Sequence, residues 1–199
     1  MIRTIIFDLG GVICPDADSW SSVYTNIVSK LGLNSEQIDR VWDRHWKELS
    51  VGKEDMIDFF EELSNKSENK ISKEKLLKYY YDDSVIYEDV FNLVKKLKES
   101  GYTLLLLSNQ TKAGMKNIVK KFGLNDVFNT IYNSADLGMT KNNPNTFRLI
   151  IKKERLNPKG TLFIDDRKHN VEMAESFGMQ GILYENLQQL KEEIKQHTK

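Results

Sequence analysis

Residues 2–11 read Ile-Arg-Thr-Ile-Ile-Phe-Asp-Leu-Gly-Gly, and this stretch decides how the rest of the chain is interpreted. The first six residues are rich in β-branched and aromatic side chains, which are typical of a strand. Two glycines follow almost at once and predict that the strand ends there. Asp8 is therefore expected at the carboxyl end of a short strand near the start of the chain.

Two later stretches repeat this arrangement of an apolar run followed by polar residues. Residues 102–107 are Tyr-Thr-Leu-Leu-Leu-Leu and lead to Ser108, and residues 161–164 are Thr-Leu-Phe-Ile and lead to Asp165. Both runs are continuously apolar rather than alternating, which is typical of strands that are covered on both faces of a parallel sheet. Weaker strand patterns lie at residues 130–132 and 181–184.

Helical patterns separate these strands, with apolar residues repeating every three to four positions. Gly101, Gly123 and Gly178 each follow such a pattern and predict where a helix stops. Pro144 suits the first turn of a helix. Strands that alternate with helices predict an α/β fold with a doubly wound, Rossmann-like parallel sheet. The expected helices of this core cover residues 88–99, 111–122, 144–154 and 168–177.

The segment between the first two strands differs, because strand patterns are absent from it. It is helical by pattern and rich in Asp, Glu, Lys and Ser, so we expect a smaller helical domain over residues 15–84. The α/β core then comprises residues 1–14 and 85–199. Three or four helices are expected in the insertion, at about residues 20–31, 35–49, 53–64 and 72–81.

One helix of this insertion carries Ile38, Trp42 and Trp46 at intervals of one turn. Such a stripe is typical of the apolar core of a helical domain. It would alternatively form a wall that faces a substrate, and the sequence leaves both interpretations open.

The composition is that of a globular protein without a global preference for a charged partner. Hydrophobic residues make up 40% and charged residues 29% of the 199 positions, and the formal net charge is zero. No overall charge therefore steers the chain to nucleic acid or to an anionic membrane. The longest purely apolar run, residues 104–107, is far shorter than the roughly 20 residues that span a bilayer. The N-terminus lacks a signal-peptide pattern, so a cytoplasmic protein is expected.

Polar side chains follow three of the expected strands: Asp8, Ser108 with Asn109, and Asp165 with Asp166. In a doubly wound sheet, ligands bind outside the carboxyl ends of the strands. The carboxylates together can hold a hard cation such as Mg²⁺, which prefers oxygen ligands. Such a cation would allow one carboxylate to attack a phosphorus atom without being repelled by its dianionic target.

A phosphate group at this edge would need donors for its remaining oxygens. Ser108, backbone amides and a lysine would supply them. Lys141 is the candidate lysine, because Gly138 and Pro144 mark its segment as a loop before a helix.

Four motifs in order give the chain a resemblance to the haloacid dehalogenase superfamily. Residues 7–13, Phe-Asp-Leu-Gly-Gly-Val-Ile, resemble its first motif, and residues 104–109 resemble its second. Residues 136–147 and 163–171 resemble the third and the fourth. The resemblance covers the whole chain and implies that the helical insertion is the family's C1 cap.

This resemblance implies a role for each side chain at the expected site. Mg²⁺ would be held by Asp8, the backbone carbonyl of Gly10 and Asp166, with Asp165 close by. Asp8 would attack phosphorus and form an aspartyl phosphate, which water would then hydrolyse. The transferring phosphate oxygens would be held by Ser108, Asn109 and Lys141.

Gly10 departs from the pattern of the family's phosphatases, which usually carry a second Asp at this position to protonate the leaving oxygen. General acid–base catalysis contributes roughly 100- to 10,000-fold in rate, so the departure should slow turnover rather than abolish attack. The substrate, an ordered water or a cap residue would have to replace the acid. Family members that resemble this chain in reading Asp-Leu-Gly at the first motif are associated with phosphatase activity toward sugar phosphates such as hexose 1-phosphates.

The resemblance predicts a magnesium-dependent phosphomonoesterase that acts on a small phosphorylated metabolite, with a sugar phosphate as the expected kind. A cap closing over the core would exclude water and large substrates. Residues 52–54 are the candidate for a substrate-specificity loop in the cap. The oligomeric state, monomer or homodimer, stays open.

Three alternatives also stay open. A binding or regulatory protein would keep the fold and lose efficient catalysis, although retention of the metal and phosphate ligands argues against it. A dehalogenase of this family would place Tyr at Gly10 and an arginine near the start of the cap, yet no arginine lies between Arg3 and Arg40. A phosphonate-cleaving relative would use a cap lysine, and no lysine there is singled out by its context.

Three residues close to the expected site are interpreted as structural. Cys14, the only cysteine, is expected in the loop that leaves the site, and it excludes both an internal disulfide and a Cys/His zinc pattern. His169 is expected at the start of the helix after the acidic pair. Asn170 is expected to fix that loop through local hydrogen bonds.

Overall fold

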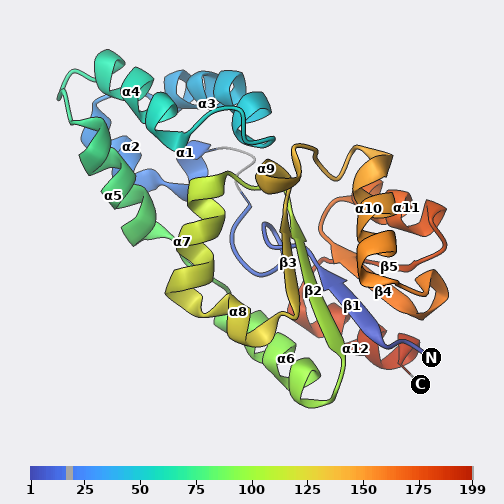
Figure 1. Cartoon of the computed structure of the whole chain (residues 1–199). Helices are drawn as coiled ribbons and strands as arrows, with labels where there is room; N and C mark the ends of the chain where they lie inside the picture. Colours follow the sequence, from blue (N-terminus) through green and yellow to red (C-terminus); the bar gives the residue numbers. More distant parts are fainter. Residues whose placement is uncertain (17–19, 199) are drawn as a thin grey trace.

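A five-stranded parallel sheet forms the centre of the computed structural model, which describes residues 1–16 and 20–198 (Figure 1). The strand order is β3-β2-β1-β4-β5, so the first strand lies in the middle. The predicted α/β fold is confirmed, and the weak strand patterns form the two edges of the sheet. The strands are β1 (Thr4–Phe7), β2 (Thr103–Ser108), β3 (Thr130–Asn133), β4 (Thr161–Asp165) and β5 (Gln180–Leu183).

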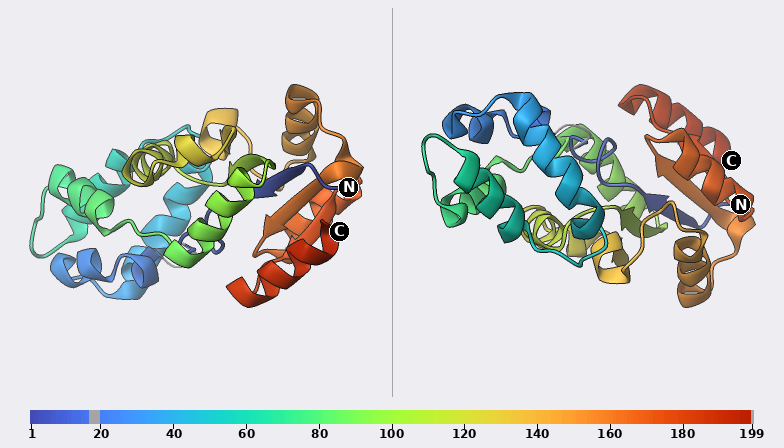
Figure 2. Two further views of the ribbon diagram at one scale, coloured as in Figure 1. Left: turned by 90° about the horizontal axis from the view of Figure 1, so that it is seen from below. Right: turned by 90° about the horizontal axis from the view of Figure 1, so that it is seen from above.

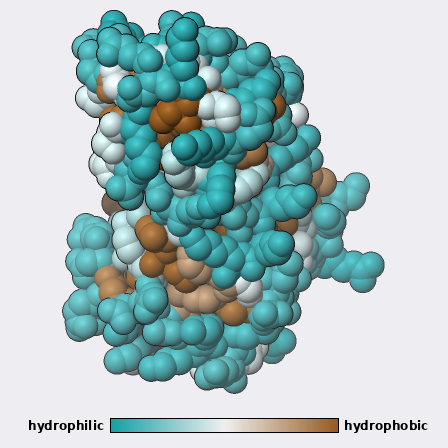
Figure 3. Space-filling model, turned by 90° about the vertical axis from the view of Figure 1, so that its left-hand side faces the viewer, coloured by the Kyte–Doolittle hydropathy of each residue, from teal (hydrophilic) through white to brown (hydrophobic). Residues whose placement is uncertain are grey.

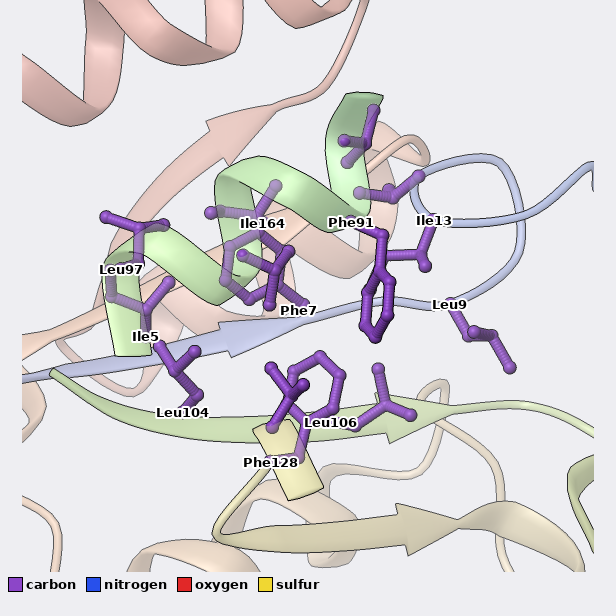
Figure 4. Packing of buried hydrophobic residues seen from close by; sticks show 14 of the residues in the cluster. Ile5, Phe7, Leu9, Ile13, Phe91, Leu97, Leu104, Leu106, Phe128 and Ile164 are labelled. Atoms are coloured by element: carbon purple, nitrogen blue, oxygen red, sulfur yellow. The ribbon is translucent and has the colours of Figure 1, made fainter. Parts of the chain in front are cut away.

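Alternate residues of β1 point to opposite faces of the sheet and enter different apolar clusters. Ile5 and Phe7 pack with residues of α6 (Glu88–Glu99) and α12 (Leu187–His197). Ile6 packs on the other face with residues of α10 (Pro144–Glu154) and α11 (Lys168–Ser176). Figure 4 shows Phe7 in the first cluster, between the sheet and the helix that carries Phe91. Burial on both faces explains why the central strands are continuously apolar.

The four predicted core helices begin and end close to their expected positions, but α12 and the one-turn helices α8 (Leu124–Val127) and α9 (Ser134–Leu137) were not predicted. The helix α12 buries only Leu190 and Ile194, and the rest of it is largely Gln, Glu and Lys. A stripe of two residues is too sparse to identify a helix by its apolar period. The remaining core helices are α7 (Lys112–Phe122) and the 3₁₀ helix η1 (Pro158–Gly160).

An inserted helical segment follows β1 and forms the predicted C1 cap, beyond the carboxyl ends of the strands (Figures 1 and 2). Its interior is aromatic: Trp20 is fully buried and contacts Tyr24, Phe59 and Phe60. The domain boundaries at residues 14 and 84 remain a prediction. The cap helices are α1 (Trp20–Val23), α2 (Thr25–Leu31), α3 (Ser35–Leu49), α4 (Met56–Lys66) and α5 (Lys73–Asp83).

Two of the expected cap helices differ from the prediction. The single helix over residues 20–31 is wrong, because Tyr24 leaves the helical conformation (φ −110°, ψ 45°) while its ring packs on Trp20. α4 starts at Met56 rather than at residue 53, because the Asp55 side chain caps it by accepting a hydrogen bond from the Ile57 N–H.

None of the described helices has the length and apolar character needed to cross a bilayer. The face seen in Figure 3 is mostly hydrophilic, with apolar atoms gathered in small patches.

The loop after α3 belongs to the cap and contacts α7 and α9 of the core. The Ser134 hydroxyl donates to the Ser50 carbonyl at 2.6 Å, and Lys112 Nζ donates to the Gly52 carbonyl at 3.3 Å. Gly52 has a φ of 72°, and a Cβ atom there would lie 2.1 Å from the Ala135 carbonyl oxygen. Only glycine allows the loop to lie this close to α9.

Substitution of Gly52 should therefore destabilise the protein through two separate effects. Gly52→Ala places a Cβ in the left-handed region, which costs about 1–3 kcal/mol, and drives it into Ala135. Gly138→Ala is the matched control, since Gly138 has a φ of 70° and a Cβ atom there would meet nothing within 4 Å. Urea denaturation should show a larger loss of unfolding free energy for Gly52→Ala. Equal losses would contradict the close contact between the loop and α9.

Candidate active site

The carboxyl ends of the central strands meet at one edge of the sheet. Phe7 on β1 pairs with Leu106 on β2 and with Ile164 on β4. The residues that follow on β1 and β4 are Asp8 and Asp165, so the two carboxyl groups stand on neighbouring strands at the same level. Parallel strand pairing thus brings together residues that are far apart in the sequence.

Lys141 reaches this edge from the loop between α9 and α10. Its side chain is only 3% exposed, and its Nζ lies 2.6 Å from Asp8 Oδ2 and 2.7 Å from Asp165 Oδ2. The loop is held by the Asn109 side chain, whose Oδ1 accepts a hydrogen bond from the Lys141 N–H at 2.9 Å. Residues from all four sequence motifs are therefore linked in one network.

Both oxygens of Asp165 are occupied by protein donors. Oδ2 accepts from Lys141, while Oδ1 accepts from the Arg167 N–H and from Asn170 Nδ2, each at 2.9 Å. The predicted role of Asn170 in fixing this loop is confirmed by that contact. Asp165 is thus positioned to hold Lys141, and its own contact with a metal remains a prediction.

Asp166 is the carboxylate with a free site for a cation. Its Oδ1 is buried and has no hydrogen-bond partner within the described protein. One oxygen each of Asp8, Asp165 and Asp166 lies within 4.8 Å of the others. Gly11 (φ 76°) makes room for this arrangement, because a Cβ there would lie 2.2 Å from Asp166 Oδ2. Three converging carboxylates with one unsatisfied oxygen fit a hard divalent cation such as Mg²⁺.

The charges at this edge are unbalanced without such a cation. Burial raises the pKa of Asp8, with Lys141 opposing the shift and the charge of Asp165 adding to it. Burial also lowers the pKa of Lys141, but the Asp8 and Asp165 carboxylates outweigh this effect, so that its pKa is raised overall. Burial raises the pKa of Asp166 to about 6, and the charges of Asp16 and Asp165 contribute. A second positive charge would favour the ionised form of each carboxyl group.

Gly10 lines the cavity beside Asp8, and its carbonyl as a metal ligand remains a prediction. A Cβ atom at Gly10 would lie 3.3 Å from Asp16 Oδ1, so another carboxylate stands next to the place where the family's phosphatases carry their second Asp. Arg167 holds Asp16 in an ion pair at 2.5 Å. Sequence reasoning missed both residues, since no strand or helix pattern indicates where the loop after Gly10 returns.

Ser108 and Asn109 differ in their position. Ser108 ends β2 and is buried, and it is not one of the residues that line the cavity. Asn109 lines the cavity and holds the backbone of Lys141. Their direct contact with a phosphate group remains a prediction for both.

A cavity of about 380 Å³ lies over these residues, between the core and the cap. Asp8 and Lys141 line it from the core, and Tyr24, Trp42 and Trp46 line it from the cap. The volume is that of a small-molecule site enclosed by two domains.

The stripe of Ile38, Trp42 and Trp46 on α3 belongs both to the apolar core of the cap and to the wall of the cavity. Ile38 and Trp42 are buried in the apolar core of the cap, while Trp42 and the partly buried Trp46 also face the cavity. Residues 52–54, the candidate specificity loop, do not line this cavity. Their glycine instead contacts α9 through the Ala135 carbonyl.

Cys14 and His169 also line the cavity. Cys14 is buried in the loop that leaves the site, and this burial raises the pKa of its thiol, with the charge of Asp8 adding to the shift. The thiol therefore stays protonated and is a poor nucleophile. His169 lies in the first turn of α11, as predicted, and is exposed.

Comparisons with known proteins agree with this arrangement. A family model described as haloacid dehalogenase-like hydrolase matches residues 2–178. D-ribitol-5-phosphate phosphatase of Bacteroides thetaiotaomicron is 29% identical, and the match covers 98% of this chain and 97% of that protein. A phosphoglycolate phosphatase of Mannheimia succiniciproducens is 21% identical, with 90% of this chain and 84% of that protein covered.

A solved structure shares the fold. A haloacid dehalogenase family enzyme of Bacteroides thetaiotaomicron, in complex with magnesium and inorganic phosphate, superposes with a TM-score of 0.75 at 22% identity. The superposition covers 93% of this chain and 95% of that chain. The similarity extends over both the core and the cap.

Removal of the unsatisfied carboxylate should change stability in a way that depends on pH and on metal. The folded state binds a proton at Asp166 more tightly than the unfolded chain, because its pKa rises from 3.8 to about 6. Metal-free wild type should therefore lose stability as the pH rises from about 4 to about 6, and Asp166→Asn should lose less. Urea denaturation across this range measures the difference.

Mg²⁺ at pH 7 should offset this loss and stabilise the wild type more than Asp166→Asn. At 100 times its Kd, the ion would add about 2.7 kcal/mol to the wild type, and it should add much less to Asp166→Asn. Asp136→Asn, an exposed acid of α9, is the control that should respond as the wild type does. An equal response of the wild type and Asp166→Asn to Mg²⁺ would contradict the assignment of Asp166 as a ligand.

Proposed function

Because the chain belongs to the haloacid dehalogenase-like hydrolases, as its four motifs indicated, we propose that it is a magnesium-dependent phosphatase of small phosphorylated metabolites. One observation carries this proposal. The buried carboxylate of Asp8 is held by Lys141 in a cavity, next to an acidic pair that has room for a cation. A nucleophile, a cation that orients it and a metal site are the parts that phosphoryl transfer requires.

Asp8 is the proposed nucleophile, and its two oxygens are fixed differently. Oδ1 accepts a hydrogen bond from the Leu9 N–H at 2.6 Å, and Oδ2 contacts Lys141 Nζ at 2.6 Å. Together these contacts restrict rotation of the Asp8 side chain and fix the orientation of its carboxylate. Asp8 attacks the phosphorus atom, the P–O ester bond breaks, and the alcohol oxygen leaves and takes a proton from water or from the phosphate itself. Water then attacks the phosphorus of the aspartyl phosphate, the bond to Asp8 breaks, and inorganic phosphate and the free carboxylate are released.

Charge balance is the central requirement of this reaction. Lys141 places one positive charge between Asp8 and Asp165, and it would attract the phosphate oxygens of the substrate. Mg²⁺, held by Asp8, the Gly10 carbonyl and Asp166, would supply the charge that lets a dianionic phosphate approach an ionised carboxylate. The backbone loop fixed by Asn109 keeps Lys141 in place during the attack.

Proton delivery is the weak point of this site. Gly10 has no side chain to protonate the leaving oxygen, so turnover should be slower than in relatives that carry the second Asp. Esters with good leaving groups should suffer least, because their alkoxides need less help from an acid.

The substrate is proposed to be small, with a sugar or polyol phosphate as the expected kind. The cap and core enclose about 380 Å³, which suits a small metabolite and excludes nucleic acid or a protein chain. The ribitol-phosphate phosphatase that matches nearly the whole chain supports this class.

The proposal is tested by assaying a panel of phosphomonoesters with purified protein, with Mg²⁺ and after removal of metal by a chelator. Wild type should hydrolyse some of the esters only with Mg²⁺. Asp8→Asn should lose on the order of 1,000-fold or more, because the whole pathway passes through this side chain. Asp136→Asn should retain activity. Hydrolysis that is unaffected by metal removal, or by Asp8→Asn, would contradict the mechanism.

A further inference from the structure

Two stacked indole rings line the cap side of the cavity, and the outer one, Trp46, is partly exposed to it. Trp42 and Trp46 stack with ring centroids 5.0 Å apart and planes at 28°. Trp42 is only 4% exposed and packs behind on Trp20 and Phe59, so the pair is held in place by the interior of the cap. An aromatic face carries negative partial charge and attracts the slightly positive C–H groups next to oxygen atoms. These indoles therefore suit the carbon skeleton of a hydroxylated molecule and are unfavourable to an anion.

Two carboxylates share this side of the cavity with the aromatic pair. Asp43 follows Trp42 on α3, and Asp83 is the last residue of α5. One oxygen of Asp83, Oδ2, is buried and accepts no hydrogen bond from the described protein. Ionised carboxylates are acceptors only, so the groups that they bind best are hydroxyl or amine donors. Together we call Trp42, Asp43, Trp46 and Asp83 the cap wall.

Positive charge lies on the opposite side of the cavity. Among the described residues that line it, the lysine and arginine side chains are Lys141 and Arg167, both of the core. Lys141 contacts the Asp8 and Asp165 carboxylates, and Arg167 is paired with Asp16. A second acidic group on a substrate would therefore face the cap wall without a lysine or arginine from the cap to balance it. Repulsion between like charges is strongest where water is excluded, as at the buried Oδ2 of Asp83, and weaker at Asp43, which is exposed.

We propose that the cap wall selects phosphomonoesters whose leaving alcohol is neutral and carries further hydroxyl groups, and that it disfavours esters with a carboxylate near the phosphate. This inference rests on the phosphatase function proposed above. The phosphate group lies at Asp8 and Lys141, the Trp46 indole, backed by Trp42, contacts the carbon skeleton, and the carboxylates of the cap wall accept hydrogen bonds from its hydroxyl groups. Selection arises from attraction to hydroxyl donors and from repulsion of acidic competitors.

This rule distinguishes between the substrates of two phosphatases that the chain matches. D-ribitol 5-phosphate carries four further hydroxyl groups and no second acid, whereas phosphoglycolate carries a carboxylate next to its ester carbon. The cap wall matches the first compound and opposes the second. Substrate choice thus follows from two side chains whose charge can be removed without changing their size.

The test compares kcat/KM for D-ribitol 5-phosphate, phosphoglycolate and p-nitrophenyl phosphate, which has neither hydroxyl groups nor a carboxylate. Wild type should prefer ribitol 5-phosphate over phosphoglycolate by about 100-fold or more, since one well-placed polar contact changes discrimination by at least this factor. Asp43→Asn/Asp83→Asn should reduce that preference by about 10-fold or more, through a gain on phosphoglycolate and a loss on ribitol 5-phosphate.

The matched control is Asp82→Asn, which removes the neighbouring acid of α5, an exposed residue paired with Lys78. It should leave the preference unchanged. Trp46→Leu provides a second variant that keeps both charges, and it should raise the KM for ribitol 5-phosphate more than the KM for p-nitrophenyl phosphate. Thermal unfolding of each variant checks that it is folded.

Each outcome has a definite meaning. Hydrolysis of p-nitrophenyl phosphate with equal kcat/KM for the two metabolites, or a preference that Asp43→Asn/Asp83→Asn leaves intact, would overturn the cap-wall inference alone. Failure to hydrolyse any of the three esters with Mg²⁺ would overturn the proposed phosphatase function, and the inference with it. A preference for ribitol 5-phosphate that the double variant weakens supports both.

Discussion

The structure depends on the burial of three carboxyl groups and one lysine at the carboxyl edge of a parallel sheet. Asp8, Asp165 and Lys141 are almost fully buried, and Asp166 is half-buried beside them. Buried charges are unfavourable unless they are paired and hydrogen-bonded. Here Lys141 pairs with two of the carboxylates, and the third keeps an unsatisfied oxygen. This imbalance favours a bound cation, and the cation in turn would prepare the site for a phosphate group.

The apolar framework of the core holds that charge cluster in place. β1 lies in the middle of the sheet, with β2 and β4 paired on either side, so Asp8 cannot move relative to Asp165 without breaking the pairing. The cap adds what the sheet edge lacks. It supplies an aromatic and acidic wall opposite the core residues Lys141 and Arg167, and Gly52 allows its loop to rest directly on α9. Catalysis and selection are therefore assigned to different domains that meet at one cavity.

Much of this arrangement could be predicted from the sequence, because strand ends are locally encoded. Continuous apolar runs that stop at Asp8, Ser108 and Asp165 identify the strands and place these side chains at one edge. Its loop and the motif resemblance predicted Lys141 as a phosphate ligand at this edge, but its contact with Asp8 was not predicted. Asp16 and Asp83 were not identified, because a residue in a returning loop or at a helix end has no periodic signal that reveals what it faces. The break at Tyr24 was missed for a similar reason, since tertiary packing of its ring on Trp20 overrides the helical pattern.

If Asp8 carries the phosphoryl group during turnover, as proposed, the bond between this residue and phosphorus can be detected directly. The protein would be acid-quenched while it hydrolyses a phosphomonoester with Mg²⁺, and then treated with borohydride, which reduces an aspartyl phosphate to homoserine. Peptide mass spectrometry would locate the reduced residue. Homoserine is expected at position 8, in an amount that depends on the substrate. Reduction at another acid, or an unmodified Asp8 in protein whose acyl phosphate is shown to accumulate, would contradict this role of Asp8.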